Sequence, residues 1–268
     1  MDLSTQRKRN RKAFARPWVL VLALLVVGVA YSTVAPSQSS ADTQMTQQIK
    51  EGKAIFETSC ASCHGMNGEG LSQGPSLVGV GAASVDFQMG TGRMPAVRAE
   101  AQIPTRQVVY SQEQIDAVAA YVASLGPGPA APEKSQYDPE GLSEEELAHG
   151  GALFRANCSA CHGITGGGGA MPEGKKAPNL SETSAVHIWE AVRSGPQQMP
   201  TFSKEVLHDD DVRAIIGYLD EVHEQPRYGG LGMGDNGPVS EGLWIFILGI
   251  GGLSIAAGWI AKKGARAR

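Results

Sequence analysis

Two copies of one five-residue motif contain all four cysteines of the chain. The chemistry-bearing residues of the two copies are Cys60, Cys63 and His64, and Cys158, Cys161 and His162. Each copy reads C-x-x-C-H, the attachment pattern of a c-type haem. Two thiols at this spacing reach both vinyl groups of one porphyrin, and the following His becomes the proximal iron ligand. The sequence therefore predicts two covalently bound haem c groups.

Two other chemistries use paired cysteines. A zinc site can be built from two C-x-x-C pairs, but zinc does not require a His directly after each pair. Disulfides are a second alternative, although this spacing is better known in redox motifs than in structural bridges. The repeated His favours haem over both.

Each haem iron needs a sixth ligand or stays open. Met94 and Met199 are the candidates, because each precedes a Pro and lies downstream of a haem motif. A thioether sulfur favours reduced iron and raises the potential. Met89 in the first domain and Met171 in the second are the rivals. Bis-His ligation is a further alternative, with these candidates: His149, His187, His208 and His223. None of them recurs in the repeat, so we interpret them as ordinary surface or helix histidines.

Two loop prolines are candidates for orienting the proximal histidines. A ligating imidazole usually donates its other N–H to a carbonyl or carboxylate, which fixes the ring. Pro75 and Pro178 occupy matching positions after the two motifs. We expect their backbone carbonyls to accept these hydrogen bonds; otherwise both are plain loop residues.

The elements that position the motifs form a tandem repeat. Gly52, Phe56 and Cys60 match Gly150, Phe154 and Cys158 at an offset of 98 residues. Met-Pro, a tyrosine and an apolar helical pattern then follow in the same order in both halves, which indicates duplication. The predicted domains are 46–125 and 144–223, joined by a Pro- and Gly-rich linker at 126–143.

Helix signals lie near the ends of the predicted domains. Ser111 with Gln114, and Ser143 with Glu146, have the spacing of capping boxes, and Leu142 with Leu147 that of a hydrophobic staple. Apolar residues recur at helical spacing from Ile115 to Leu125 and from Val212 to Val222. The predicted fold is all-α, with two small domains whose cores the porphyrins complete.

Two uncharged apolar runs flank these domains, at 18–35 and 243–260. Eighteen helical residues span ~27 Å, near the thickness of a bilayer core. Basic residues before the first run (segment 1–17) and after the second (segment 261–268) predict cytoplasmic termini. A Gly-rich connector, 224–242, precedes the second run. The alternative for the first run is a cleaved signal peptide. Either topology puts the domains outside the cytoplasm, where haem is attached.

Charge and composition exclude several function classes. Between the two apolar runs, 13 basic residues stand against 26 acidic ones, which disfavours nucleic-acid binding. No catalytic triad, phosphate loop or acid–base pair stands out. With both axial positions filled, a haem transfers electrons rather than binding a small molecule, so we expect no small-molecule substrate.

Each half resembles a class I cytochrome c domain, through C-x-x-C-H and the matched Gly, Phe, Pro, Met and Tyr positions. The whole architecture resembles the dihaem cytochrome c subunit of the actinobacterial cytochrome bcc complex, a menaquinol–cytochrome c reductase. That resemblance implies a multi-pass protein of the cell membrane that works with a cytochrome b and a Rieske iron–sulfur protein. It implies an electron-transfer subunit of an oxidoreductase, with no catalytic site of its own, that delivers electrons to an aa3-type cytochrome oxidase.

Two other functions remain open from the sequence. The second hypothesis is a dihaem cytochrome of another enzyme, such as a cbb3-type oxidase or a membrane-bound dehydrogenase. A different class is a zinc- or disulfide-stabilised extracytoplasmic binding module. The C-terminal apolar run favours the bcc assignment, because many other such cytochromes have only an N-terminal anchor or none.

Overall fold

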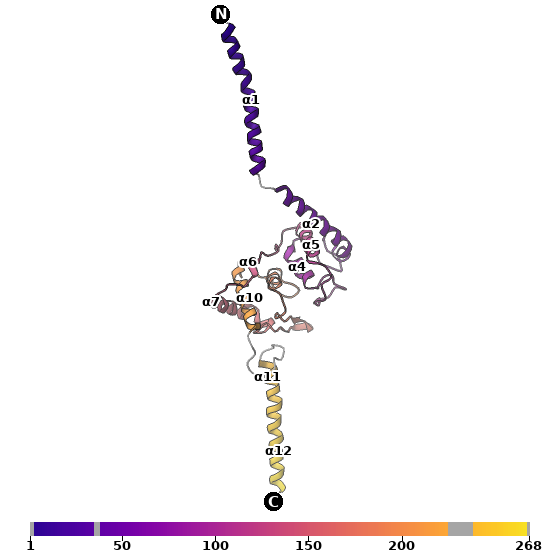
Figure 1. The fold of residues 1–268 in the computed structure, drawn as a ribbon. Helices are drawn as coiled ribbons and strands as arrows, with labels where there is room; N and C mark the ends of the chain where they lie inside the picture. The colour runs from indigo at the N-terminus through magenta and orange to yellow at the C-terminus, as the bar shows by residue number, and fades with distance from the viewer. Residues whose placement is uncertain (1–2, 35–37, 225–237, 267–268) are drawn as a thin grey trace. The chain divides into compact units, whose positions relative to one another are not determined.

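The computed structural model describes residues 3–34, 38–224 and 238–266. The chain is mostly helical (Figure 1). It divides into two compact units, residues 1–47 and 48–268, and the second contains both haem motifs. Most of the predicted connector 224–242 lies outside the described residues, as do Ala35 and the last two residues of the basic tail.

The first repeat contains four helices. Its elements are α2 (Gln38–Ser59), α3 (Ala61–His64), α4 (Gly81–Gly90) and α5 (Gln112–Ala123). Ser111 caps α5 with the predicted box, since its side chain accepts from Gln114 N while the Gln114 side chain accepts from Ser111 N. The helix ends two residues before Leu125, the last position of the predicted pattern.

The second repeat has the same order of helices with one addition. Its elements are α7 (Glu144–Asn157), α8 (Ser159–His162), β1 (Gly169–Ala170), η1 (Pro172–Gly174), β2 (Lys176–Ala177), α9 (Ala185–Ser194) and α10 (Asp209–Glu224). The capping box of Ser143 and Glu146 opens α7 as predicted. Strands β1 and β2 pair antiparallel, with Gly169 opposite Ala177. The fold is therefore mostly helical rather than all-α, and no hairpin signal in this part of the sequence is strong enough to predict these two-residue strands.

A glycine lets the first and last helices of each repeat cross in contact. A Cβ on Gly52 would lie 1.8 Å from the Ala117 carbonyl oxygen on α5, and one on Gly150 would lie 2.0 Å from the Ala214 oxygen on α10. No side chain fits at either crossing. Beside them, Phe56 packs on Tyr121 and Phe154 on Tyr218, with ring centroids 5.1 and 5.7 Å apart.

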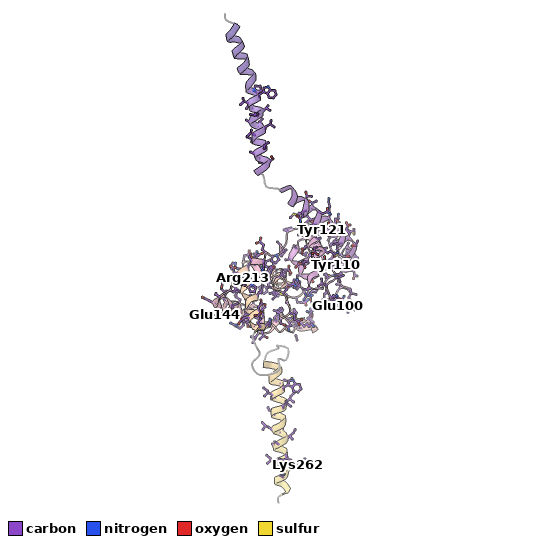
Figure 2. All side chains as sticks on the ribbon, in the orientation of Figure 1. Glu100, Tyr110, Tyr121, Glu144, Arg213 and Lys262 are labelled. Carbon is purple, nitrogen blue, oxygen red and sulfur yellow. The ribbon has the colours of Figure 1, made fainter. Side chains whose placement is uncertain are left out.

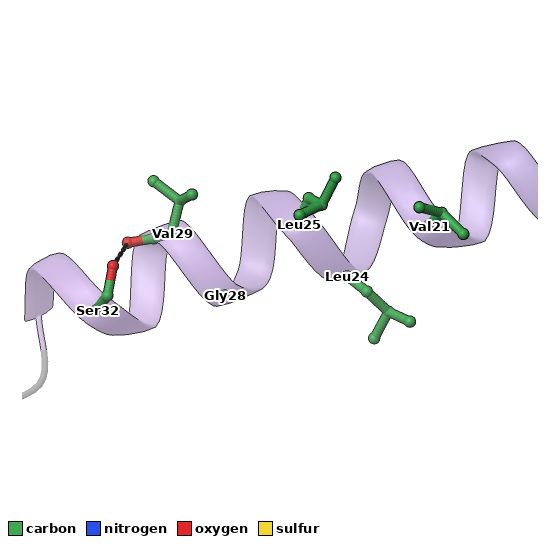
Figure 3. Close-up of a pocket in the computed structure, with 6 residues that line it drawn as sticks. All are labelled: Val21, Leu24, Leu25, Gly28, Val29 and Ser32. Atoms are coloured by element: carbon green, nitrogen blue, oxygen red, sulfur yellow. Dashed lines mark hydrogen bonds between the residues drawn. The ribbon is translucent and has the colours of Figure 1, made fainter.

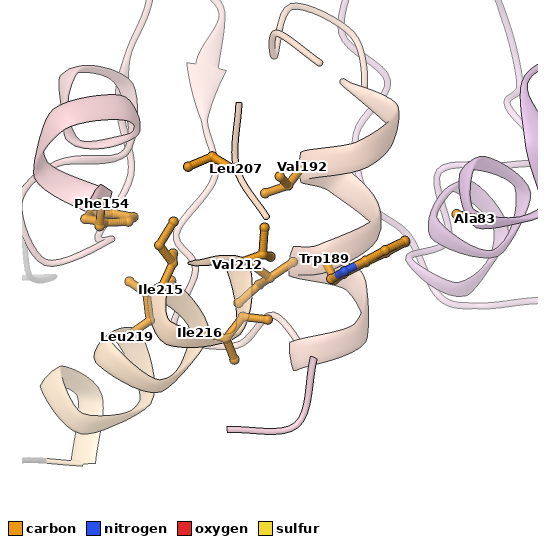
Figure 4. Packing of buried hydrophobic residues seen from close by; sticks show 10 residues of the cluster. Ala83, Phe154, Trp189, Val192, Leu207, Val212, Ile215, Ile216 and Leu219 are labelled. Atoms are coloured by element: carbon orange, nitrogen blue, oxygen red, sulfur yellow. The ribbon is translucent and has the colours of Figure 1, made fainter. Parts of the chain in front are cut away.

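Each repeat has its own apolar core. In the first, Phe56, Ile115, Val118 and Val122 are buried together with Met89. In the second, Phe154 packs with residues from α9 and α10, as Figure 4 shows: Trp189, Val192, Val212, Ile215, Ile216 and Leu219. Ala83 of α4 belongs to this second cluster and lies beyond Trp189 in Figure 4. The two cores therefore meet where α4 packs on α9.

The predicted linker 126–143 is packed rather than extended. Ala83 N donates to the Pro129 carbonyl at 3.2 Å, which holds the start of the segment on the first repeat. A short helix, α6 (Lys134–Tyr137), follows and contacts α9 and α10. Gln136 Nε2 donates to Asp209 Oδ2 at 2.6 Å. The Pro-rich composition indicated a break in the helical pattern, but not these contacts.

The loop after Met94 also joins the two repeats. Gln102 exchanges two hydrogen bonds with the backbone of Lys176 in β2, at 2.6 and 3.0 Å. Gln198 Nε2 donates to the Ala101 carbonyl at 2.9 Å, and Gln197 Nε2 to the Ile103 carbonyl at 3.1 Å. The residues just before Met199 are thus held against the loop that follows Met94.

The two apolar runs are helical. Helix α1 (Leu3–Val34) contains the first run up to Val34, and its described side chains are exposed (Figure 2). Figure 3 shows apolar side chains projecting from α1, with Ser32 Oγ donating to the Val29 carbonyl at 2.9 Å. Its apolar described part, Pro17–Ser32, is shorter than the ~20 residues that a spanning helix needs. The structure therefore supports an apolar helix here without establishing the predicted span.

The C-terminal run meets the length requirement. Helix α11 (Pro238–Ile245), a π-helical turn η2 (Phe246–Ile250) and α12 (Gly251–Arg266) follow one another without a gap. Within them, Gly242–Lys263 contains an 18-residue window with a mean hydropathy of 2.0, none of which is buried in the protein. Among the described residues it is the one helix long and apolar enough to cross a membrane.

The glycine crossing generates a stability prediction. We expect Gly150→Ala to lower the free energy of unfolding by roughly 1–3 kcal/mol, because the added methyl group meets backbone that cannot move without separating α7 from α10. Thermal unfolding followed by circular dichroism measures this. Gly249→Ala is the matched control, since a Cβ there meets nothing within 4 Å. An equal melting temperature for both variants would contradict the close crossing.

Candidate haem sites

The backbone of the C-x-x-C-H motif is the same in both repeats. Cys60 and Cys158 each end the preceding helix, with φ/ψ of −118°/−34° and −119°/−34°. The next turn then closes on the first cysteine. His64 N donates to the Cys60 carbonyl and His162 N to the Cys158 carbonyl, both at 3.0 Å. One helical turn thus places the two cysteines and the histidine around a common point in each domain.

Both histidine rings are held by the predicted proline carbonyls. His64 Nδ1 lies 2.7 Å from the Pro75 oxygen, and His162 Nδ1 lies 3.1 Å from the Pro178 oxygen. A carbonyl only accepts, so Nδ1 carries the proton and Nε2 keeps its lone pair. That tautomer is the one that binds a metal through Nε2. The prediction for Pro75 and Pro178 is confirmed.

The loops that present these carbonyls depend on a glycine in each repeat. Gly68 and Gly166 have φ of +70° and +76°, and their carbonyls accept from Leu77 N and Leu180 N at 2.7 and 2.8 Å. The offset is 98 residues for the glycines and 103 for the leucines. The second loop is therefore longer by five residues, and the β1–β2 hairpin occupies this insertion.

The thiols fit covalent attachment to a porphyrin. All four cysteines are free in the structure. Burial, followed by the neighbouring Cys63, raises the pKa of Cys60 to about 11, and burial with Cys161 does the same for Cys158. These groups are neutral thiols at physiological pH, in partly apolar surroundings. Burial also lowers the pKa of His162, which favours the neutral imidazole.

The zinc and disulfide interpretations fit less well. Among the residues that the structure describes, the one cluster of three metal-binding side chains includes no residue of either motif. The donor set of each motif, two thiols and one oriented imidazole, matches haem c.

The candidate methionines lie in two kinds of surroundings. Met94 and Met199 are half-buried and pack at the edge of the first and second cores. Met89, the rival in the first domain, is 5% exposed and is a core residue of α4. Met171, the rival in the second, lies at the end of the hairpin, where its N–H donates to the Lys175 carbonyl at 2.8 Å.

Three of the other four histidines have ordinary roles. His149 pairs with Asp211 at 3.1 Å on the surface, and the backbone N–H of His208 donates to the same carboxylate. His223 Nε2 donates to the Thr165 carbonyl at 2.9 Å. His187 differs, because it lies half-buried between the two repeats, near Asp86 and the fully buried Glu190. His187 and Glu190 are three residues apart on one helix, but Asp86 is about a hundred residues earlier in the chain and all three lie outside the repeat pattern, so the sequence did not reveal the cluster.

Family models match both repeats. The "Cytochrome c" model matches residues 49–126, and the model described as "Cytochrome C oxidase, cbb3-type, subunit III" matches residues 145–219. Together with the paired motifs and the oriented histidines, these matches define a c-type cytochrome with two domains, each of which carries one covalently bound haem c.

Comparison with similar proteins identifies a particular family within this class. The chain is 40% identical over 263 residues to the "Cytochrome bc1 complex cytochrome c subunit" of Mycobacterium tuberculosis, covering 96% of this chain and 94% of the relative. It is 38% identical to the subunit of the same name from Corynebacterium diphtheriae, covering 96% of both chains. A cbb3-type cytochrome c oxidase subunit from Azospirillum is 29% identical, over 63% of this chain and 60% of the relative. The chain belongs to the family of cytochrome c subunits of the cytochrome bc1 complex.

The histidine–proline bond generates a redox prediction. A Cβ on Gly74 would lie 2.9 Å from the Cys63 oxygen and 3.1 Å from His64 Cε1, so Gly74→Val should push the Pro75 loop off the ring. Losing the Nδ1 bond makes the imidazole a weaker ligand for ferric iron. We expect the midpoint potential of one haem to rise by about 60 mV, which corresponds to a tenfold change for one electron. A redox titration measures this, and the second haem is the internal control. A shift of both haems, or of neither, would contradict the assignment of this loop to one site.

Proposed function

We propose that the chain is the dihaem electron-transfer subunit of a menaquinol–cytochrome c reductase and relays electrons from a Rieske iron–sulfur protein to an aa3-type cytochrome oxidase. The observation that supports this most is the likeness to bc1-complex cytochrome c subunits over nearly the whole chain. A complex of that kind supplies the cytochrome b and Rieske partners.

In this proposal the chain's residues hold two haems and set their properties. Cys60 and Cys63 attach the first, and Cys158 and Cys161 attach the second. His64 and His162 would ligate the irons through Nε2, and Met94 and Met199 would supply the second protein ligand of each iron. The bound haems supply one-electron transfer at a potential raised by the thioether sulfur.

Contacts between the repeats support transfer within one chain. The loop after Met94 is hydrogen-bonded to Gln197 and Gln198, directly before Met199. Both proposed axial ligands therefore lie on loops that meet each other. A chain that keeps its two haem domains in contact needs no diffusing cytochrome between donor and acceptor. The fold itself sets the effective concentration of one domain at the other.

The two terminal helices hold this relay at the membrane. Helix Gly242–Lys263 would span the bilayer, and α1 would anchor the other end as a retained helix. The basic residues at both ends of the chain favour cytoplasmic termini. The protein is then multi-pass, and its haem domains face the extracytoplasmic side, where a Rieske cluster and an oxidase copper centre would be reached.

The axial ligands are tested by exchanging one methionine at a time. Met199→His should lower the potential of one haem by on the order of 100 mV, because imidazole favours ferric iron more than a thioether does, while covalent attachment persists. Met171→His is the matched control, since Met171 is the rival of Met199 in the same domain. A redox titration in which Met171→His, and not Met199→His, moves a potential would reverse the assignment. Met94→His should act on the other haem.

The complex itself is tested by purification. Tagged full-length protein extracted in mild detergent should bring with it a b-type cytochrome and a Rieske protein, seen by reduced-minus-oxidised spectra and mass spectrometry. Co-purification of a dehydrogenase without any b-type cytochrome would overturn the proposal. It would favour the alternative, a membrane-anchored dihaem cytochrome of another respiratory enzyme. The Azospirillum likeness makes a cbb3-type oxidase the first of these to test.

A further inference from the structure

A cluster of three metal-binding side chains lies between the two haem domains. Asp86 comes from α4 of the first domain, and His187 and Glu190 come from successive turns of α9 in the second. One ligand atom of each lies within 4.8 Å of the other two. His187 Nε2 is 3.9 Å from Asp86 Oδ2. Neither haem motif contributes to the cluster.

Glu190 is the unexplained member of the cluster. It is 0% exposed, and neither of its carboxylate oxygens has a hydrogen-bond partner. A buried carboxylate without partners is strongly unfavourable. Burial raises the pKa of Glu190 to about 10, followed by Asp86, which would hydrogen-bond the protonated acid and repels the charged one. The site therefore lacks a positive charge or a proton between the two acids.

The surroundings orient the other two ligands. Gln112 Nε2 donates to Asp86 Oδ1 at 2.7 Å, which leaves Oδ2 for His187 and Glu190. The His187 ring meets the edge of Phe87 at 6.2 Å, and a Cβ on Gly90 would lie 2.8 Å from its Nε2. Only glycine at position 90 leaves room on this side of the imidazole.

Arg93, which follows α4 in the first domain, lies over the Phe87 ring at 4.7 Å. Burial lowers the pKa of His187; Asp86 opposes this effect and Arg93 adds to it. A neutral imidazole is the form that binds metal. Both oxygens of Glu190 stay unpartnered beside it.

We propose that Asp86, His187 and Glu190 bind a divalent cation of the zinc class, which joins the two haem domains across the α4–α9 contact. One imidazole nitrogen and two carboxylate oxygens suit Zn²⁺, with water in the fourth position. Tetrahedral ligands at ~2.0–2.1 Å from zinc lie ~3.3 Å from one another. The observed 3.9 Å between His187 and Asp86 is therefore closed by a small side-chain shift. Both side chains keep some exposure, 20% and 14%, which leaves an entry path for the ion.

Zinc binding to the full-length haem-loaded protein in detergent tests the proposal. After dialysis against a chelator, the protein is titrated with Zn²⁺, and bound zinc and haem iron are counted by elemental mass spectrometry. We expect about one zinc for every two haem irons. Asp86→Asn and His187→Ala should each weaken zinc binding at least ~100-fold, and Gln112→Ala by ~10–100-fold, because it orients a ligand.

His149→Ala is the matched control. His149 forms a His–Asp pair with Asp211 at 3.1 Å, but that pair has no third ligand among the described residues. Its loss should leave zinc binding unchanged. Haem spectra and circular dichroism show that each variant is folded.

Two results would overturn the proposal. One is a wild-type protein that retains no zinc above the level of the Asp86→Asn and His187→Ala variants. The other is zinc lost equally in the His149→Ala variant. Glu190→Gln tests the remaining explanation, a proton shared by Asp86 and Glu190 in place of a metal. That explanation holds if the wild type binds no zinc and the variant has a higher melting temperature in the absence of zinc.

Discussion

Each half of this protein depends on one backbone carbonyl placed against one imidazole. The Pro75 and Pro178 oxygens accept hydrogen bonds from Nδ1–H of His64 and His162, which leaves Nε2 free to bind iron. The carbonyls are held by loops that close on a left-handed glycine, Gly68 or Gly166, and the motifs stand on helices that cross at Gly52 or Gly150. The ligand geometry is therefore set by backbone hydrogen bonds and glycine contacts, with little contribution from polar side chains.

These constraints explain why so small a domain folds in a regular way. A short chain buries limited apolar surface, and here each core consists of a few aliphatic residues around a Phe–Tyr pair, with Trp189 added in the second. At the close crossing the backbones of two helices touch, so the helices gain packing contacts without large side chains. A porphyrin attached through the cysteines at the helix end would then add the apolar surface that the side chains do not supply.

Much of this could be predicted from the sequence, because the signals are local. The C-x-x-C-H motifs, the capping boxes of Ser111 and Ser143 and the matched prolines each depend on residues close in the chain. The contacts between domains could not be predicted, since they join positions far apart. Gln102 forms a hydrogen bond with Lys176, and Asp86 lies near His187 and Glu190. No sequence spacing links these residues of one domain to those of the other. The packing of segment 126–143 was missed for the same reason, because Pro-rich composition shows where a helix stops and not what the chain then touches.

The hairpin β1–β2 has a consequence for how a duplicated protein acquires direction. Two identical carriers in series would accept and release electrons equally well from either end. In the first domain the corresponding loop is closed by a single bridge between Leu71 and Gly74, whereas the second carries five more residues and a paired ribbon. That ribbon rests on the first domain through Lys176 and Gln102. The insertion thus makes the two domains chemically distinguishable, so in the proposed relay selection could assign one domain to the donor and the other to the acceptor.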